Sequence, residues 1–161
     1  MSNQRQRLYW DACVWLSYIN GIADRLPILD ALLGDSTSNA GTVEIYTSVL
    51  SQVEVAFAKA EQDNKALDSD VEKQIDEMWA DRNALKLAEY HEIIGKEARS
   101  FIRLAMTKGW HLRSIDAIHL ATAKYCQVAE FHTYDERLLK YSSDIGFPVV
   151  VPHTLHPRMP I

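Results

Sequence analysis

The sequence is short of cysteine and has no long apolar run, and each shortage excludes a class of protein. Its two cysteines, Cys13 and Cys126, lack metal-ligand spacing and lie in segments that look buried, which fits reduced thiols in a cytoplasm better than a disulfide framework. No apolar run approaches the roughly 20 residues that span a bilayer, and the N-terminus carries no secretion-signal pattern. We therefore expect a soluble, cytoplasmic protein without a membrane segment.

An excess of basic charge is also missing. The formal net charge of −5 argues against general coating of nucleic acid, which usually requires a basic surface. A nuclease is not excluded, because carboxylates gathered around divalent cations are themselves acidic and the bound metal reverses the local charge. The chain has neither a GxxxxGK[ST] phosphate loop nor a GxGxxG motif, which counts against a phosphatase or other phosphoryl-transfer enzyme on a different α/β fold.

The composition that is present is that of one folded domain. The chain has 161 residues, of which 47% are hydrophobic and 24% charged. These values are typical of a globular protein too short for two ordinary domains. No internal repeat, low-complexity tract or long linker divides the chain, so we expect a single domain over residues 1–161.

Hydrophobic periodicity predicts strands that alternate with helices. Strand-like runs cover residues 8–10, 42–50, 85–90, 129–135 and 147–152. Helical patterns begin after Asp11 and cover residues 28–33, 51–61, 68–81, 91–110 and 114–125, with a loop at 34–41. This alternation indicates an α/β fold in which helices flank a central, mostly parallel sheet.

Two of the predicted helices carry apolar faces. The face of residues 51–61 consists of Val53, Phe57 and Ala60, and that of the acidic segment 68–81 consists of Val71, Ile75, Met78 and Trp79. We assign the second face, together with Trp15, to the core or to a protein contact.

The stretch "RSIDAIHLATAKY", residues 113–125, puts a carboxylate beside the apolar surface of a predicted helix. Ser114 is a good candidate for the helix N-cap, and the helix dipole favours an acid such as Asp116 in the first turn. Ordinary helix-start chemistry is therefore one interpretation of Asp116. The positions of the other acids favour a functional one.

Four acids fall at strand ends or helix starts: Asp11, Glu54, Asp116 and Asp135. The carboxyl ends of parallel strands and the helix N-termini that follow them share one edge of a sheet, so we expect these carboxylates to meet in one pocket. Unpaired carboxylates repel one another, and all-oxygen ligation suits Mg²⁺ or Mn²⁺. The acids therefore predict a metal site of the kind that hydrolyses phosphodiesters.

Four segments carry a family resemblance: "YWDACVW", "TSVLSQVEVAFA", "LRSIDAIHLATAKY" and "FHTYDERLLKY". They resemble the four acidic motifs of the PIN domain, in order and at family-like spacing, over nearly the whole chain. The last two are the most specific, and their form is similar to bacterial and archaeal VapC-type toxins. The resemblance implies a Mg²⁺- or Mn²⁺-dependent ribonuclease with the four acids at the family's acidic positions. It alone implies an antitoxin partner and a homodimer.

The chain departs from the family pattern after the first acid. Many members place a hydroxyl residue and an Asn there, whereas this chain has Ala12 and Cys13, so the help of those side chains is absent or altered. Thr133 is retained, and we assign it to orienting Asp135 or a metal-bound water. Ser51 either plays a similar supporting role or, as we favour, caps the helix that carries Glu54.

Basic residues recur at i, i+3 and i+7 on the predicted helix 91–110. Lys96, Arg99 and Arg103 form this stripe, and Arg113 and Lys108 extend it. A track for RNA is one interpretation, and an ordinary solvated helix surface is the other.

The leading hypothesis is a metal-dependent endoribonuclease, the toxin of a toxin–antitoxin pair, in which the four acids bind the metal. The alternative is a PIN-like module that binds RNA or protein without cutting; the altered residues after Asp11 favour it mildly, and the retained acids argue against it. We assign His119 to packing or hydrogen bonding and Glu136 to a solvated helix start. Spacing does not encode the RNA target, because recognition of single-stranded RNA depends on loop shape and stacking.

Overall fold

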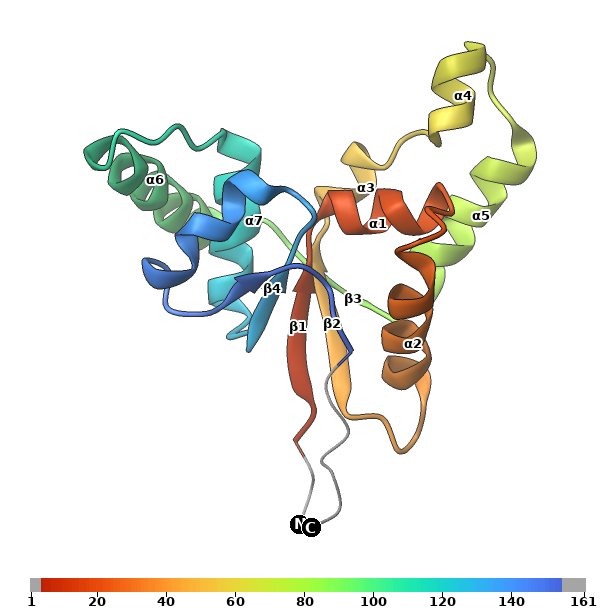
Figure 1. Ribbon diagram of the computed structural model, residues 1–161, viewed down its shortest axis with the longest axis horizontal. Helices are drawn as coiled ribbons and strands as arrows, with labels where there is room; N and C mark the ends of the chain where they lie inside the picture. Colours follow the sequence, from red (N-terminus) through yellow and green to blue (C-terminus); the bar gives the residue numbers. More distant parts are fainter. Residues whose placement is uncertain (1–3, 155–161) are drawn as a thin grey trace.

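The computed structural model describes residues 4–154, and its centre is a five-stranded sheet (Figure 1). The strands are β1 (Gln6–Trp10), β2 (Val43–Ser48), β3 (Lys86–Ala88), β4 (Glu130–His132) and β5 (Val149–Val150). They lie in the order β3-β2-β1-β4-β5, and each neighbouring pair is parallel. The predicted α/β class is confirmed. Residues 1–3 and 155–161 of the predicted domain lie outside the described residues.

Helices cover both faces of this sheet. They are α1 (Ala12–Ile19), α2 (Leu26–Thr37), α3 (Ser51–Glu54), α4 (Lys59–Asn64), α5 (Ser69–Ala80), α6 (Glu92–Thr107), α7 (Ser114–Tyr125) and the 3₁₀ helix η1 (Glu136–Ser143). Figure 1 shows α6 and α7 on one side of the sheet and α1, α2 and α5 on the other. Within the described chain, no helix combines the length and the apolar character needed to cross a bilayer.

The central strand β1 separates two hydrophobic cores. Tyr9 belongs to the core built with α6 and α7, whereas Leu8 and Trp10 belong to the core built with α1, α2 and α5. All three side chains are fully buried. Burial on both faces explains why this strand is an uninterrupted apolar run, as is usual in parallel sheets.

Aromatic packing confirms that the apolar face of α5 belongs to the core. Ile75 and Trp79 are buried, and the Trp79 ring lies 5.3 Å from the ring of Trp15. Trp15 lies in turn 4.7 Å from the ring of Trp10, at the end of β1. This stack fixes α1 and α5 against the strand that leads to Asp11.

The prediction of one helix over residues 51–61 is wrong. The helix stops after Glu54, since Val55 adopts φ −98° and ψ 50°, and α4 begins only at Lys59. Val55 is fully buried in the core, whereas Val53 is 75% exposed and Phe57 43% exposed. The spacing of Val53 and Phe57 indicates one continuous apolar helix face, but in the structure Val55 is the residue that enters the core.

The prediction of a loop over residues 34–41 is wrong at its first half, because α2 continues to Thr37. Ser36 is buried, and its hydroxyl donates to the carbonyl groups of Leu33 and Ala84. The Asp35 carboxylate accepts from the backbone N–H of Val43 at 2.8 Å. Serine and aspartate side chains favour loops because they compete for backbone hydrogen bonds. Here Ser36 and Asp35 find partners within the fold, and the Asp35 contact ties the end of α2 to β2.

Candidate active site

Asp11 is the residue that joins β1 to α1. It is the N-cap of α1, and its Oδ1 accepts hydrogen bonds from the Val14 N–H at 3.4 Å and from the Cys13 thiol at 2.7 Å. Only 5% of the residue is exposed. The strand end therefore delivers a buried carboxylate to the carboxyl edge of the sheet, as the sequence predicts.

Burial raises the pKa of Asp11, and the hydrogen bonds from Cys13 and Thr133 oppose that rise. Among the described residues, no lysine, arginine or histidine forms an ion pair with Asp11 within 4.0 Å. A buried carboxylate without a compensating charge is electrostatically unfavourable. Asp11 is therefore the acid in this region whose environment most requires a bound cation.

Cys13 stands where many family members have an Asn, and its thiol makes three polar contacts in the site. Its thiol lies 3.3 Å from the Thr133 hydroxyl and accepts from the Tyr134 N–H at 3.3 Å, in addition to donating to Asp11. Burial and the neighbouring Asp11 carboxylate raise the pKa of Cys13, so the sulfur keeps its proton and remains a donor. Cys13 thus orients Asp11, and the neighbouring Ala12 packs in the core. Both cysteines are free, as expected.

Thr133 connects Asp11 with Asp135. The strand β4 ends at His132, earlier than predicted, and Asp135 is the N-cap of η1. The fully buried Thr133 hydroxyl accepts from the Asp135 N–H at 3.0 Å and touches Cys13. Thr133 thus holds the backbone of Asp135, and its role in orienting Asp135 or a metal-bound water stays a prediction.

Arg113 connects Asp116 with Asp135. Its Nε donates to Asp116 Oδ2 at 2.7 Å and its second terminal nitrogen to Asp116 Oδ1 at 3.2 Å, while Asp135 Oδ2 lies 3.9 Å from that nitrogen. Arg137 forms a second fork on Asp135, and this hydrogen bonding lowers the pKa of Asp135. Both acids thus have positive partners in the metal-free protein, which distinguishes them from Asp11.

The N-cap prediction for α7 is wrong by one residue. Arg113 occupies the N-cap position without a side-chain cap, and Ser114 is the first helical residue. The guanidinium group of Arg113 instead forms an ion pair with Asp116, three residues later, and this pair stabilises the first turn of the helix.

Glu54 is held by a buried chain of hydrogen bonds. Its Oε2 lies 2.5 Å from His119 Nε2, and His119 Nδ1 lies 2.7 Å from the Tyr9 hydroxyl. The Tyr9 oxygen accepts from the Ser48 N–H at 3.0 Å, so its own proton is directed at Nδ1. His119 then carries its proton on Nε2 and donates it to Glu54. The expected hydrogen-bonded histidine is confirmed, and its partner is a candidate metal ligand.

Ser51 is not the N-cap of α3, because Leu50 occupies that position. The fully buried Ser51 hydroxyl lies 2.7 Å from the Thr47 hydroxyl, which donates to the Trp10 carbonyl at 2.7 Å. Ser51 therefore fastens the start of α3 to the residue that precedes Asp11. Its hydroxyl contacts the Thr47 hydroxyl and not a carboxylate.

Shared partners connect the acids at the edge where α1, α3 and η1 begin (Figure 1), although in the described chain no three of their carboxylates come within 4.8 Å of one another. Asp116 and Asp135 share Arg113, and Asp11 and Asp135 are linked through Cys13 and Thr133. Glu54 joins this group through His119, which lies on the same helix as Asp116. A groove of about 660 Å³ between α1, α2 and α5 is lined by none of these acids.

The basic stripe has two different environments. Lys96 pairs with Glu92 at 3.2 Å, and Lys108 pairs with Asp144. Arg99 and Arg103 instead line a groove of about 260 Å³ between α6 and the start of α7. Glu136 is exposed in the first turn of η1, consistent with a solvated helix-start acid.

Sequence reasoning missed the partners that position the acids. Tyr9 and Cys13 looked like ordinary residues of a buried strand and helix, and Arg113 looked like part of a surface stripe. The signal for Arg113 and His119 was available, because both lie three residues from Asp116 and therefore near its helix face. No local signal could reveal that Tyr9 contacts His119, since 110 positions separate them.

The donor set fits a hard divalent cation. The four acids offer carboxylate oxygens, the ligands that Mg²⁺ and Mn²⁺ prefer, and Asp11 is buried without a charge partner. Arg113 supplies the opposite charge for Asp116 and Asp135 in the metal-free protein.

Several solved structures have a similar fold. VapBC-1 from nontypeable Haemophilus influenzae matches with TM-score 0.63 and 10% identity, covering 89% of this chain and 96% of that chain. VapBC2 from Rickettsia felis, bound to a DNA fragment from its promoter, matches with TM-score 0.63 and 12% identity over 89% and 97%. FitAcB from Neisseria gonorrhoeae matches with TM-score 0.59 and 17% identity over 90% and 97%. At these identities the likeness shows the fold.

No curated protein sequence matches the chain. The family model of the PIN domain matches residues 8–143. This span includes Asp11, Glu54, Asp116 and Asp135 together with β2, β3, β4 and most of β1. On the strength of this match and of the fold, the chain belongs to the PIN domain family.

Proposed function

We propose that this chain is a metal-dependent endoribonuclease. The observation that carries the proposal is the buried and uncompensated Asp11, connected through Cys13, Thr133 and Arg113 to Asp135 and Asp116. Membership of the PIN domain family, whose members are nucleases, supports the same reaction class. When bound, Mg²⁺ or Mn²⁺ would activate water and stabilise charge on a phosphodiester.

The residues of the site divide into ligands and supports. Asp11, Asp116 and Asp135 would share the metal, and Glu54 completes the set. His119 holds the Glu54 carboxylate, and Cys13 and Thr133 hold those of Asp11 and Asp135.

Arg113 has a dual place in this proposal. It neutralises Asp116 and Asp135. A metal ion on these two carboxylates would compete with the guanidinium group, and Arg113 would then be able to contact a phosphate. Arg99, Arg103 and Lys96 on α6 extend the proposed path for RNA.

We further propose that the protein is the toxin of a toxin–antitoxin pair in the cytoplasm, active as a homodimer. The similar folds in VapBC and FitAcB complexes support a protein partner. A small open reading frame directly beside this gene, with a DNA-binding N-terminus, is the corresponding genetic observation.

Cleavage of an RNA pool with randomised loops, supplied with Mg²⁺ or Mn²⁺, tests the reaction directly. Asp116→Asn preserves side-chain volume and removes the charge that holds the cation, so cleavage should fall at least about a hundredfold, which is roughly 2.7 kcal/mol of barrier. Asp76→Asn is the matched control, because Asp76 is exposed on α5, and it should cleave like wild type. Chelation should abolish cleavage in both active proteins.

Equal cleavage by wild type and Asp116→Asn would sink the catalytic assignment. Binding of the RNA pool by wild type without any metal-dependent cleavage would support the alternative of a non-catalytic PIN-like module instead.

A further inference from the structure

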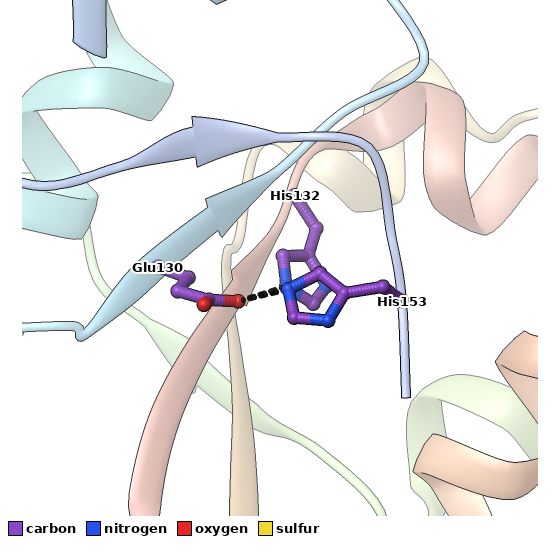
Figure 2. Close-up of side chains that lie close together, drawn as sticks. All are labelled: Glu130, His132 and His153. Atoms are coloured by element: carbon purple, nitrogen blue, oxygen red, sulfur yellow. Dashed lines mark hydrogen bonds and ion pairs between the residues drawn. The ribbon is translucent and has the colours of Figure 1, made fainter. Parts of the chain in front are cut away.

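A second cluster of side chains that can bind a metal ion lies on the sheet. It consists of two histidines and one glutamate, His132, His153 and Glu130, and not of carboxylates alone. Glu130 and His132 alternate with Phe131 along β4, so they share one face of the strand while Phe131 enters the α6–α7 core. The register places them beside Leu8 and Trp10 of β1. His153, from the segment after β5, reaches over the same face (Figure 2).

The three side chains converge on one carboxylate oxygen. Glu130 Oε2 lies 2.8 Å from His132 Nε2 and 2.9 Å from His153 Nε2. The donor atoms of the three residues all lie within 4.8 Å of one another. Figure 2 shows both rings turned toward the carboxylate from two different segments of the chain.

The hydrogen bonds of the two rings show what a metal ion would replace. The Glu130 carboxylate only accepts, so its contacts require a proton on His132 Nε2 and on His153 Nε2. A metal ion bound at this point would take the place of those protons. His132 Nδ1 is buried without a hydrogen-bond partner among the described residues.

We propose that Glu130, His132 and His153 form a second metal site, selective for Zn²⁺ and distinct from the carboxylate site. Two imidazole nitrogens and one carboxylate oxygen suit Zn²⁺, with water as fourth ligand, whereas Mg²⁺ prefers oxygen donors alone. Ligand atoms about 2.0–2.2 Å from Zn²⁺ in a tetrahedral arrangement are roughly 3.4 Å apart. The present spacings of 2.8 and 2.9 Å need to open only slightly.

The site joins a weakly held segment to the strand that serves the acids. The edge strand β5 has two residues, and within residues 4–154 its one neighbouring strand is β4. A metal bridge from β4 to His153 would therefore fasten the segment after β5. The His132 carbonyl accepts from the Asp11 N–H at 3.4 Å, and Thr133 and Asp135 follow on the same segment. The metal therefore has a structural role that does not depend on RNA cleavage.

Binding is measured on metal-free full chain titrated with Zn²⁺, and with Co²⁺ as a spectroscopic probe, in excess Mg²⁺ that fills the carboxylate site. One equivalent should bind wild type, and Co²⁺ should give the visible absorption of four-coordinate cobalt. His153→Ala and Glu130→Gln should each weaken binding by more than about tenfold, since even outer partners of metal ligands contribute that much. Zn²⁺ should raise the melting temperature of wild type and not that of His153→Ala.

Two control variants separate this site from its surroundings. His111→Ala removes an exposed histidine from the loop before α7, and Asp116→Asn damages only the carboxylate site; both should bind Zn²⁺ like wild type. The partly exposed His153 tolerates truncation, so a metal-free melt of His153→Ala close to wild type verifies that the variant is folded. Wild-type affinity in His153→Ala, loss of binding in Asp116→Asn, or no binding by wild type would each overturn the proposal.

Discussion

Cys13 illustrates how a single residue alters a family site without removing its chemistry. The sequence indicates lost or altered support, because a hydroxyl residue and an Asn are common after the first acid. The structure shows a protonated thiol that donates to Asp11 and contacts Thr133. A thiol is a weaker hydrogen-bond donor than a hydroxyl, so Cys13 fixes the Asp11 carboxylate with less electrostatic stabilisation.

Asp11 is also the residue where charge and stability conflict most. From the sequence, each acid of the cluster is expected to be destabilised by repulsion from the others. In the structure, Arg113 forms two hydrogen bonds with the Asp116 carboxylate. Among the described residues Asp11 has no such partner, and burial raises its pKa. The folded state therefore binds the Asp11 proton more tightly than the unfolded state. Ionisation of Asp11 costs stability as pH rises above about 4, the value of an unfolded Asp.

We predict that Asp11→Asn stabilises the metal-free protein at pH 7 and that this gain disappears near pH 4. Asn retains an oxygen that can accept from Cys13 and Val14, and it is as good an N-cap as Asp. A gain of about 1 kcal/mol would raise the melting temperature by roughly 2–4 °C. Thermal melts across that pH range measure the effect, and an equal loss of stability at both pH values would contradict it.

At the scale of elements, α7 places three residues of the site at a spacing of three. Arg113 is the N-cap residue, and Asp116 and His119 follow at intervals of three, so each lies about one turn from the next. Arg113 contacts Asp116 and Asp135, and His119 contacts Glu54. The small residues Ala117 and Ala121 are buried in the core, which lets the helix lie close to its neighbours. The segment 113–125 thus provides both a packing surface and the polar side chains that contact the acids.

The turn between α2 and β2 depends on a glycine for space. A Cβ on Gly41 would lie 2.0 Å from the Asp35 carbonyl oxygen, whereas one on Gly34 would meet no atom within 4 Å. We predict that Gly41→Ala destabilises the protein by about 2 kcal/mol or more, since backbone must move. Gly34→Ala in α2 should stabilise it by up to about 1 kcal/mol. Denaturant unfolding of both variants checks this pair, and equal effects would refute it.

At the scale of the whole molecule, two cores on opposite faces hold the sheet while charged groups gather at its carboxyl edge. The cores keep the strand ends in register and hold the four acids at this edge, although like charges repel one another and this repulsion costs free energy. A cation that binds only the folded chain offsets this cost. Metal binding should therefore raise the free energy of unfolding of the whole chain.

We predict that Mn²⁺ raises the melting temperature of wild type and raises that of Asp116→Asn less. A ligand at a hundred times its Kd adds about 2.7 kcal/mol to the folded state. His153→Ala should respond to Mn²⁺ like wild type, because its donors belong to the other cluster. Calorimetric or fluorescence melts with and without Mn²⁺ measure this, and an identical response in all three proteins would exclude Mn²⁺ binding at the acids.

The sequence alone determines the α/β class, the parallel sheet and the placement of four acids at strand ends and helix starts. These features follow from local periodicity and from the fact that parallel strands end at one edge. The family motifs are equally local, which is why they are visible in short segments. The helix break at Val55 is not visible in this way, because burial of that side chain overrides the helical pattern around it.

Only the tertiary structure decides which groups the acids touch. The contacts of His119 with Tyr9 and Glu54 bridge 110 and 65 positions, and Cys13 reaches Thr133 across 120. His153 meets Glu130 because the chain after β5 turns back over the free face of β4. Local propensity carries no information about such returns, since they depend on how the packed cores position segments that are distant in sequence.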